Sequence, residues 1–296
     1  MHDKGQATGA TDGQRPASAA RGRVKAAKLV GGAAMTVATL LAARAIASRP
    51  DGRDGASNGT YPPLDTLKPV ADGVWVVDSG PLRPLGVPVP LRMTVLRLGN
   101  GDLLLHSPTR HTAELARGLE AIGPVRHLIA PNGAHWMYVR EWQDAYPDAI
   151  TWAAPGLRDR AQVRRSGIRF DHDLGDQAPD AWAREIGQGV VPAALGFREV
   201  YLFHRATRTL VLTDLIENLD PARVAPYAGL LMRLAGGADG KPARHLRAVL
   251  RLGGAESAAA VRKLVELAPE RVVFSHGRWF EERGAERLAR AFRRLT

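Results

Sequence analysis

The polar residues that follow short apolar runs are the positions of this sequence where chemistry could take place. The chain has 296 residues, including nine His and no Cys. A metal ion would therefore need His, Asp, Glu or Asn ligands, and neither a disulfide framework nor a thiolate nucleophile can form. The candidates occur in LLLHSPT, PNGAHW, VLTDLIEN and VVFSHG, and they are His106, Asn132, His135, Asp214 and His276.

Each candidate also has a structural interpretation. Asp214 can cap the segment that follows it or accept hydrogen bonds from nearby backbone amides. His276 can shape the turn at the end of its strand. His135 can stack in an aromatic cluster with Trp136 and Tyr138. The remaining histidines show no ligand spacing and are interpreted as surface or core residues; they are His111, His127, His172, His204 and His245.

Other kinds of site lack a supporting motif. No Ser lies in a Gly-x-Ser-x-Gly elbow, no GxxxxGK[ST] loop is present, and the glycines follow no dinucleotide fingerprint. The net charge of +11 is uneven, because it divides into about +5 over residues 1–60, about −1 over 61–240 and about +7 over 241–296. No recognition element combines Lys and Arg with aromatic residues, so we expect no nucleic-acid partner.

The N-terminal part differs in composition from the rest. We predict a disordered basic tail over residues 1–28 and a flexible linker over 48–60. Between them, residues 29–47 begin with LVGGAAMTVATLLAA, an apolar run behind several Lys and Arg residues and interrupted by Arg44. Three interpretations stay open for this segment, namely a membrane anchor with its basic end in the cytoplasm, a cleaved signal segment, and an Ala-rich surface helix. We accordingly expect a membrane-associated protein, with a secreted or periplasmic and a cytoplasmic location as alternatives.

Residues 61–296 have the pattern of one globular domain. Apolar runs predict strands, Asn100-Gly101 predicts a hairpin turn, and apolar residues at helical spacing predict intervening helices. Residues 224–235, VAPYAGLLMRLA, are interpreted as core, with a lid or a partner-binding helix as alternatives. Strand pairs interleaved with helices suggest an α/β fold with four layers, in which two mixed sheets are faced by helices. The predicted strands cover residues 73–78, 93–98, 103–106, 127–132, 150–154, 200–203, 210–213 and 271–275.

The same segments resemble the metallo-β-lactamase superfamily, and more narrowly a branch of it described only as a domain of unknown function. The narrower resemblance is carried by RMTVLRL, GDLLLHSP, LIAPN, EWQDAYP and VLTDLIEN, and it covers about residues 65–280. It implies an αββα sandwich whose strand ends converge on one rim.

The resemblance also implies that most metal ligands of the superfamily are missing. The Asp of the first loop corresponds to His106. The His-x-His-x-Asp-His motif falls on Pro131, Gly133, His135 and Trp136, which retains one of its four ligands.

The later motifs of the superfamily are kept in part. Its third His would lie in residues 189–193, which contain no His, whereas Asp214 matches the metal-bridging Asp and His276 the last His. The resemblance therefore implies no two-metal site. It leaves His135, Asp214 and His276 as ligands for one zinc or other divalent ion, with His106, Asn132 and Trp136 lining the cleft.

Two functions follow from this pattern. We interpret the chain as a degenerate, non-catalytic binding or scaffold domain near a membrane. The alternative is a single-metal hydrolase that activates water against an ester, amide or phosphoester, with His135 as third ligand or proton shuttle. The expected partner is a small-molecule substrate or another protein.

Overall fold

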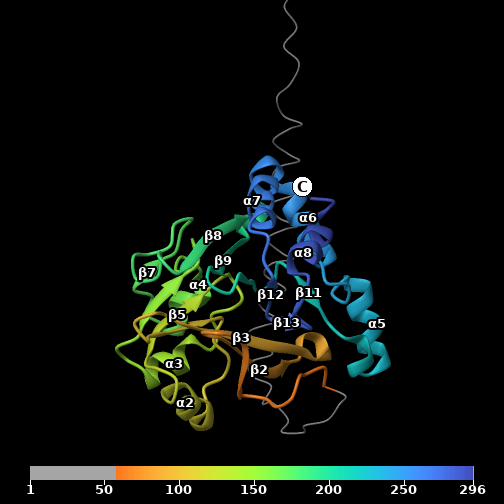
Figure 1. The fold of residues 1–296 in the computed structure, drawn as a ribbon. Helices are drawn as coiled ribbons and strands as arrows, with labels where there is room; N and C mark the ends of the chain where they lie inside the picture. The colour runs from red at the N-terminus through yellow and green to blue at the C-terminus, as the bar shows by residue number, and fades with distance from the viewer. Residues whose placement is uncertain (1–57, 296) are drawn as a thin grey trace, which may run out of the picture. The chain divides into compact units, whose positions relative to one another are not determined.

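The computed structural model describes residues 58–295 (Figure 1). The predicted tail, the apolar segment 29–47 and most of the predicted linker lie outside the described residues. The end of that linker is attached to the fold, because Asn58 forms a β-bridge with Val224 and the Thr60 side chain is buried. Within residues 58–295, no helix combines the length and the apolarity needed to cross a membrane.

The first sheet has seven strands in the order of the chain. Its first four strands are antiparallel, and β4 to β7 are parallel. The predicted hairpin at Asn100-Gly101 joins β3 to β4, and Gly101 has a φ of 91°, which such tight turns require. The strands are β1 (Leu67–Ala71), β2 (Val74–Leu82), β3 (Val89–Arg97), β4 (Leu103–His106), β5 (Val125–Ala130), β6 (Ile150–Ala153) and β7 (His172–Asp173).

Helices connect the parallel strands of this sheet. They are α2 (Ala113–Glu120), α3 (Val139–Ala145) and α4 (Ala161–Ser166). At the start of α2, the Thr112 hydroxyl caps the helix by accepting a hydrogen bond from the Leu115 amide. Its Leu115 and Leu119 lie one turn apart and are both buried, so the helix turns one apolar face to the sheet.

The second sheet has the order β12-β10-β9-β8 and is also mixed. Strands β9 and β10 contain the predicted strands 200–203 and, for the most part, 210–213, and they pair antiparallel as a hairpin with His204 opposite Thr209. Strands β11 (Glu217–Asn218) and β13 (His276–Gly277) form a separate parallel pair. The other strands and helices here are β8 (Ile186–Pro192), β9 (Arg198–His204), β10 (Thr209–Val211), β12 (Arg271–Val273), α5 (Pro226–Ala235), α6 (Arg244–Leu252), α7 (Gly254–Glu266) and α8 (Gly284–Phe292).

The apolar clusters show how these elements are layered. One cluster lies between the sheets and includes Leu104 of β4 and Val211 of β10. The neighbours of Leu104 in β4 belong to a different cluster, where Leu105 packs with α2 and α3, because successive strand residues face opposite sides. A third cluster joins the second sheet to α6, α7 and α8, which lie on the far side from α2 and α3 in Figure 1. The predicted four-layer αββα sandwich is confirmed.

Residues 224–235 were predicted to belong to the core, but only one face of the helix that they form, α5, is buried. Ala228, Gly229 and Met232 of α5 are buried, as a core helix requires. Its large apolar residues on the other side are exposed, and they are Tyr227, Leu230, Leu231 and Leu234. Apolar composition alone could not reveal this, because α5 is apolar on both faces and the fold buries only one of them.

Candidate metal centre

Three side chains from distant parts of the chain meet at one point. His135 Nε2 and His276 Nε2 each lie 3.0 Å from Asp214 Oδ1, and the two Nε2 atoms are 3.3 Å apart. These three residues form the metal cluster, the one group within residues 58–295 whose His and carboxylate ligand atoms converge in this way. The Asp214 side chain keeps 23% of its surface exposed, so the cluster is open to solvent.

The topology explains this convergence. His135 follows β5, Asp214 follows β10 and His276 follows β12. The pairs β4–β5 and β10–β12 are parallel, so the carboxyl ends of each pair lie at one edge of its sheet. This is the edge where open α/β sheets usually bind ligands.

The geometry of the metal cluster fits a zinc ion. Tetrahedral zinc with bonds of about 2.0–2.2 Å to nitrogen and oxygen requires ligand atoms roughly 3.3 Å apart. The three observed separations, 3.0, 3.0 and 3.3 Å, are close to that value. Two imidazoles and one carboxylate suit zinc chemically, and three protein ligands leave one coordination position open.

Hydrogen bonds on the far side of each ring hold the histidines in this orientation. His276 Nδ1 lies 2.8 Å from the Pro90 carbonyl oxygen, which can only accept, so Nδ1 carries a proton. In the neutral ring this leaves the Nε2 lone pair directed at Asp214. His135 Nδ1 lies 2.6 Å from the Ser107 hydroxyl, which can play the same orienting role.

Asn132 connects the ligand loops. Its side-chain amide donates to Asp214 Oδ2 at 2.8 Å and to the Thr213 hydroxyl at 2.9 Å. Its side-chain carbonyl accepts from the backbone amides of Ala134 at 2.8 Å and His135 at 3.0 Å. Asn132 therefore occupies one carboxylate oxygen of Asp214 and leaves the other, Oδ1, facing the histidines.

Glu199 supports the same site and was missed by sequence reasoning. It is fully buried on β9, and its carboxylate accepts hydrogen bonds from the backbone amides of Thr213 at 2.7 Å, Asp214 at 2.8 Å and Leu215 at 3.2 Å. Burial and the nearby charge of Asp214 raise the pKa of Glu199, which the amide hydrogen bonds partly offset. An acidic residue inside the strand REVYLFH was the available signal, because charged residues are rarely buried without a partner.

We expect Glu199→Gln to weaken zinc binding about 10- to 100-fold, the usual range for residues that orient metal ligands. The amide has one oxygen in place of two, and its NH₂ group opposes the backbone amides of the Asp214 loop. Glu185→Gln is a matched control, because Glu185 also accepts a backbone hydrogen bond, from Gly99 at 2.7 Å. Affinity is measured by competition with a chromophoric chelator, and a Glu199→Gln protein that is less stable but binds zinc normally would show a purely structural role.

Protons can occupy the metal cluster when no metal ion is bound. Burial lowers the pKa of His276, but the hydrogen bond and charge of Asp214, aided by Glu217 and the Pro90 carbonyl, raise it to about 9. Burial raises the pKa of Asp214, yet the charges and hydrogen bonds of the two histidines hold it well below its usual range. Both shifts favour a protonated His276 paired with an ionised Asp214.

The three residues predicted to line the cleft differ in whether they contact the metal cluster. Asn132 contacts Asp214 directly, as described above. Trp136 is half-buried, donates to the Gly133 carbonyl at 3.2 Å and packs on the inter-sheet core. His106 is buried in β4, and neither it nor Trp136 is a member of the metal cluster.

His106 should make folding stability depend on pH. Burial lowers its pKa to about 3 in the folded protein, against about 6.5 in an unfolded chain. Between these values the unfolded chain binds the extra proton, so the free energy of unfolding is highest above about pH 6.5 and falls on acidification. The contribution from this residue approaches about 1.4 kcal/mol per pH unit.

The measurement is urea unfolding of wild type and His106→Asn between about pH 4 and pH 7. We expect a shallower pH dependence for the variant, whereas replacing the exposed His245 by Asn should leave the wild-type slope. Equal slopes for His106→Asn and wild type would contradict the assignment.

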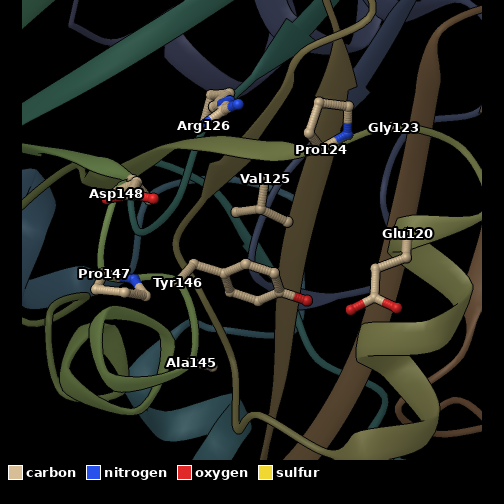
Figure 2. Close-up of a pocket in the computed structure, with 10 residues that line it drawn as sticks. Glu120, Gly123, Pro124, Val125, Arg126, Ala145, Tyr146, Pro147 and Asp148 are labelled. Atoms are coloured by element: carbon tan, nitrogen blue, oxygen red, sulfur yellow. The ribbon is translucent and has the colours of Figure 1, made fainter.

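A separate pocket lies away from the metal cluster. It has a volume of about 520 Å³ and is lined by the end of α2, the start of β5 and the end of α3. Figure 2 shows Tyr146 extending across it toward Glu120. Since Val125 begins β5 and His135 follows its end, the pocket and the metal cluster lie at opposite ends of that strand.

Comparison with solved structures identifies the fold. The metallo-β-lactamase from Hirschia baltica matches with a TM-score of 0.52 at 14% identity, covering 76% of this chain and 94% of that one. The metallo-β-lactamase from Pontibacter korlensis gives 0.53 at 14% identity, with coverages of 77% and 97%. The FIM-1 metallo-β-lactamase from Pseudomonas aeruginosa, solved in its mono-zinc form, gives 0.53 at 15% identity, with coverages of 78% and 93%. At such identities the likeness concerns the fold alone.

Sequence comparison identifies the family. No curated protein matches the chain. The model of a domain of unknown function, DUF4336, matches residues 71–229, which is more than half of the 296 residues. The matched range includes β2 to β10 and two of the three residues of the metal cluster, His135 and Asp214. The chain thus belongs to the DUF4336 family and has a metallo-β-lactamase-like fold.

Proposed function

We propose that this protein binds one divalent metal ion, for which zinc is the best match, and uses it to hydrolyse an ester, amide or phosphoester. The observation that carries the proposal is the convergence of His135, Asp214 and His276, whose ligand atoms lie 3.0 to 3.3 Å apart. The mono-zinc form of FIM-1, a protein of the same fold, supports a single-ion arrangement.

The residues of this chain would divide the work as follows. A zinc ion held by His135, Asp214 and His276 would act as a Lewis acid and lower the pKa of a bound water to about 7. Ser107 and the Pro90 carbonyl would orient the two imidazoles. Asn132 would orient the carboxylate of Asp214, and Glu199 would fix the backbone amide of Asp214. Asp214 Oδ2 faces Asn132 and Asp214 Oδ1 faces the two histidines. The solvent-exposed side of the site is left for substrate and water.

The second candidate is the non-catalytic binding or scaffold role. One observation favours it, because Asp214 Oδ1 can accept hydrogen bonds from both Nε2 atoms when protons occupy the metal cluster. In that state the ionised Asp214 is paired with the histidines by hydrogen bonds, and the cluster requires no metal ion.

The experiment that separates the two uses the full chain without a His tag. After exposure to zinc and gel filtration, its metal content is measured, and hydrolysis of nitrophenyl esters, nitrocefin and bis-nitrophenyl phosphate is followed with and without a chelator. One zinc per chain and chelator-sensitive hydrolysis support the proposal. Bound zinc without hydrolysis of any substrate class would reduce it to a metal-binding domain, and a folded, zinc-free protein would establish the second candidate.

A further inference from the structure

The outer face of α5 is the largest concentration of exposed apolar side chains in the described part of the chain. Tyr227, Leu230, Leu231 and Leu234 are 57, 58, 46 and 55% exposed. They recur at the spacing i, i+3, i+4, i+7, which places them in one stripe along the helix. Among the other large apolar side chains whose burial the structure describes, Ile150 is 37% and Leu252 is 70% exposed. The stripe formed by these four residues is called the outer stripe.

The outer stripe contributes one hydrogen bond to the rest of the fold, from the Tyr227 hydroxyl to the Gly86 carbonyl oxygen at 3.3 Å, and its three leucines leave most of their surface to solvent or nearly so. The inner face of the helix packs through Ala228 and Met232 against Leu219 and Val224. The packing is close at Gly229, where an added Cβ would lie 2.7 Å from the Pro221 carbonyl oxygen. A helix that is apolar on both faces is normally covered on both, so the outer stripe indicates a missing contact.

Basic residues lie at the C-terminal end of the outer stripe. Arg233 is exposed in the last turn of α5, and the side chains of Arg244 and Arg247 approach Gly236 at its C-cap. The helix itself carries no acidic residue. An apolar stripe with a cationic end fits an anionic lipid surface, because leucines enter the acyl boundary while arginines meet the headgroups. Two copies of the chain packed through this face would bring like charges close together.

The N-terminal segment joins the fold beside this helix. Asn58 forms a bridge with Val224, and the Gly59 amide donates to the Arg223 carbonyl at 3.0 Å, just before α5 begins at Pro226. In the sequence, the ten residues 48–57 separate Asn58 from the apolar, basic-flanked segment 29–47.

We propose that the outer stripe of α5 docks on the surface of an anionic phospholipid bilayer. The stripe lies along the interface, as an amphipathic monotopic helix does, and does not cross the membrane. This docking is independent of whether the metal cluster is catalytic.

The absence of Cys makes a site-specific test simple. A single Cys is introduced by Leu231→Cys in the full chain and labelled with an environment-sensitive nitrobenzoxadiazole dye. Leu252→Cys is the matched control, because Leu252 is 70% exposed on α6, outside the outer stripe. Vesicles of phosphatidylcholine with about 30% phosphatidylglycerol should shift the emission of the Leu231→Cys label to the blue and allow quenching by nitroxide lipids. The label at Leu252→Cys should not respond.

A second measurement gives the contribution of the outer stripe to binding of the bilayer. In vesicle sedimentation, Leu230→Gln/Leu234→Gln should lower the partition coefficient about tenfold or more, whereas Leu252→Gln should not change it. High salt and pure phosphatidylcholine should both weaken binding. No vesicle-dependent response at Leu231→Cys would overturn the proposal. A label already blue-shifted without vesicles would also overturn it, since the stripe would then be covered by residues 29–47 or, if the shift depends on concentration, by a second copy.

Discussion

Replacing Asp214 by Ala should lower the affinity of the protein for zinc by more than about 100-fold. This exceeds the 10- to 100-fold effect usual for residues that only orient a ligand, because Asp214 is the anionic member of the metal cluster and lies 3.0 Å from both histidine nitrogens. Without its charge, two neutral imidazoles remain, which is fewer than the three protein ligands of most catalytic zinc sites. Affinity is measured by competition with a chromophoric chelator, and the spectrum of bound Co²⁺ reports the ligand geometry.

Two further variants make this result interpretable. Asp214→Asn keeps the shape of the side chain and a carbonyl oxygen, so we expect an intermediate affinity in a protein that folds normally. Asp180→Ala removes an exposed carboxylate elsewhere and should bind zinc as wild type does. If Asp214→Ala and Asp180→Ala bound zinc equally well, the metal would lie elsewhere and the proposed function would fail.

Arg92→Met should lower the free energy of unfolding by about 3 kcal/mol or more, the range for removing one partner of a buried ion pair. Arg92 is 3% exposed and donates to Asp78 Oδ1 at 2.5 Å. It also donates to the carbonyl oxygens of Phe274 at 2.9 Å and Gly277 at 2.7 Å. Lys68 still pairs with Asp78 at 2.8 Å, which keeps the expected loss toward the lower end of the range.

The same change should reach the metal cluster, because Phe274 and Gly277 bracket His276. We therefore expect weaker zinc binding as well as a lower denaturant midpoint, both measured against Arg97→Met, an exposed arginine at the end of the same strand. Adding Asp78→Asn to Arg92→Met should recover part of the lost stability, because this second change removes the buried carboxylate that Arg92→Met leaves without its main partner. An Arg92→Met protein as stable as Arg97→Met would contradict this account.

Local signals identified elements whose conformation is decided within a few residues. Asn100-Gly101 specified its hairpin, and Leu115 and Leu119 specified the buried face of α2. Strand β8, IGQGVVP, was missed because its Gly and Pro residues disfavour a strand. The reason it forms is non-local, since Gly189 pairs with Tyr201 of β9 and an added Cβ there would lie 2.4 Å from the tyrosine hydroxyl.

The candidate site likewise contains residues that the sequence identified and a residue that only the structure revealed. His135, Asp214 and His276 could be chosen from motif resemblance, but their mutual distances depend on how β5, β10 and β12 end. Glu199 gave no motif, because its partners are backbone amides 14 to 16 residues further along the chain. The exposure of Leu230 and Leu234 depends on which side of α5 the fold happens to cover.

By itself, the amino-acid sequence determined most of the elements, their order and the donor types available to a metal. Tertiary structure alone decided that two imidazoles and one carboxylate meet within 3.3 Å, and that an arginine and a glutamate buried behind them hold the ligand loops. The physical reason is that side-chain spacing along one strand or helix follows from local geometry, whereas the approach of residues about 60 to 140 positions apart follows from strand pairing and packing of the whole fold.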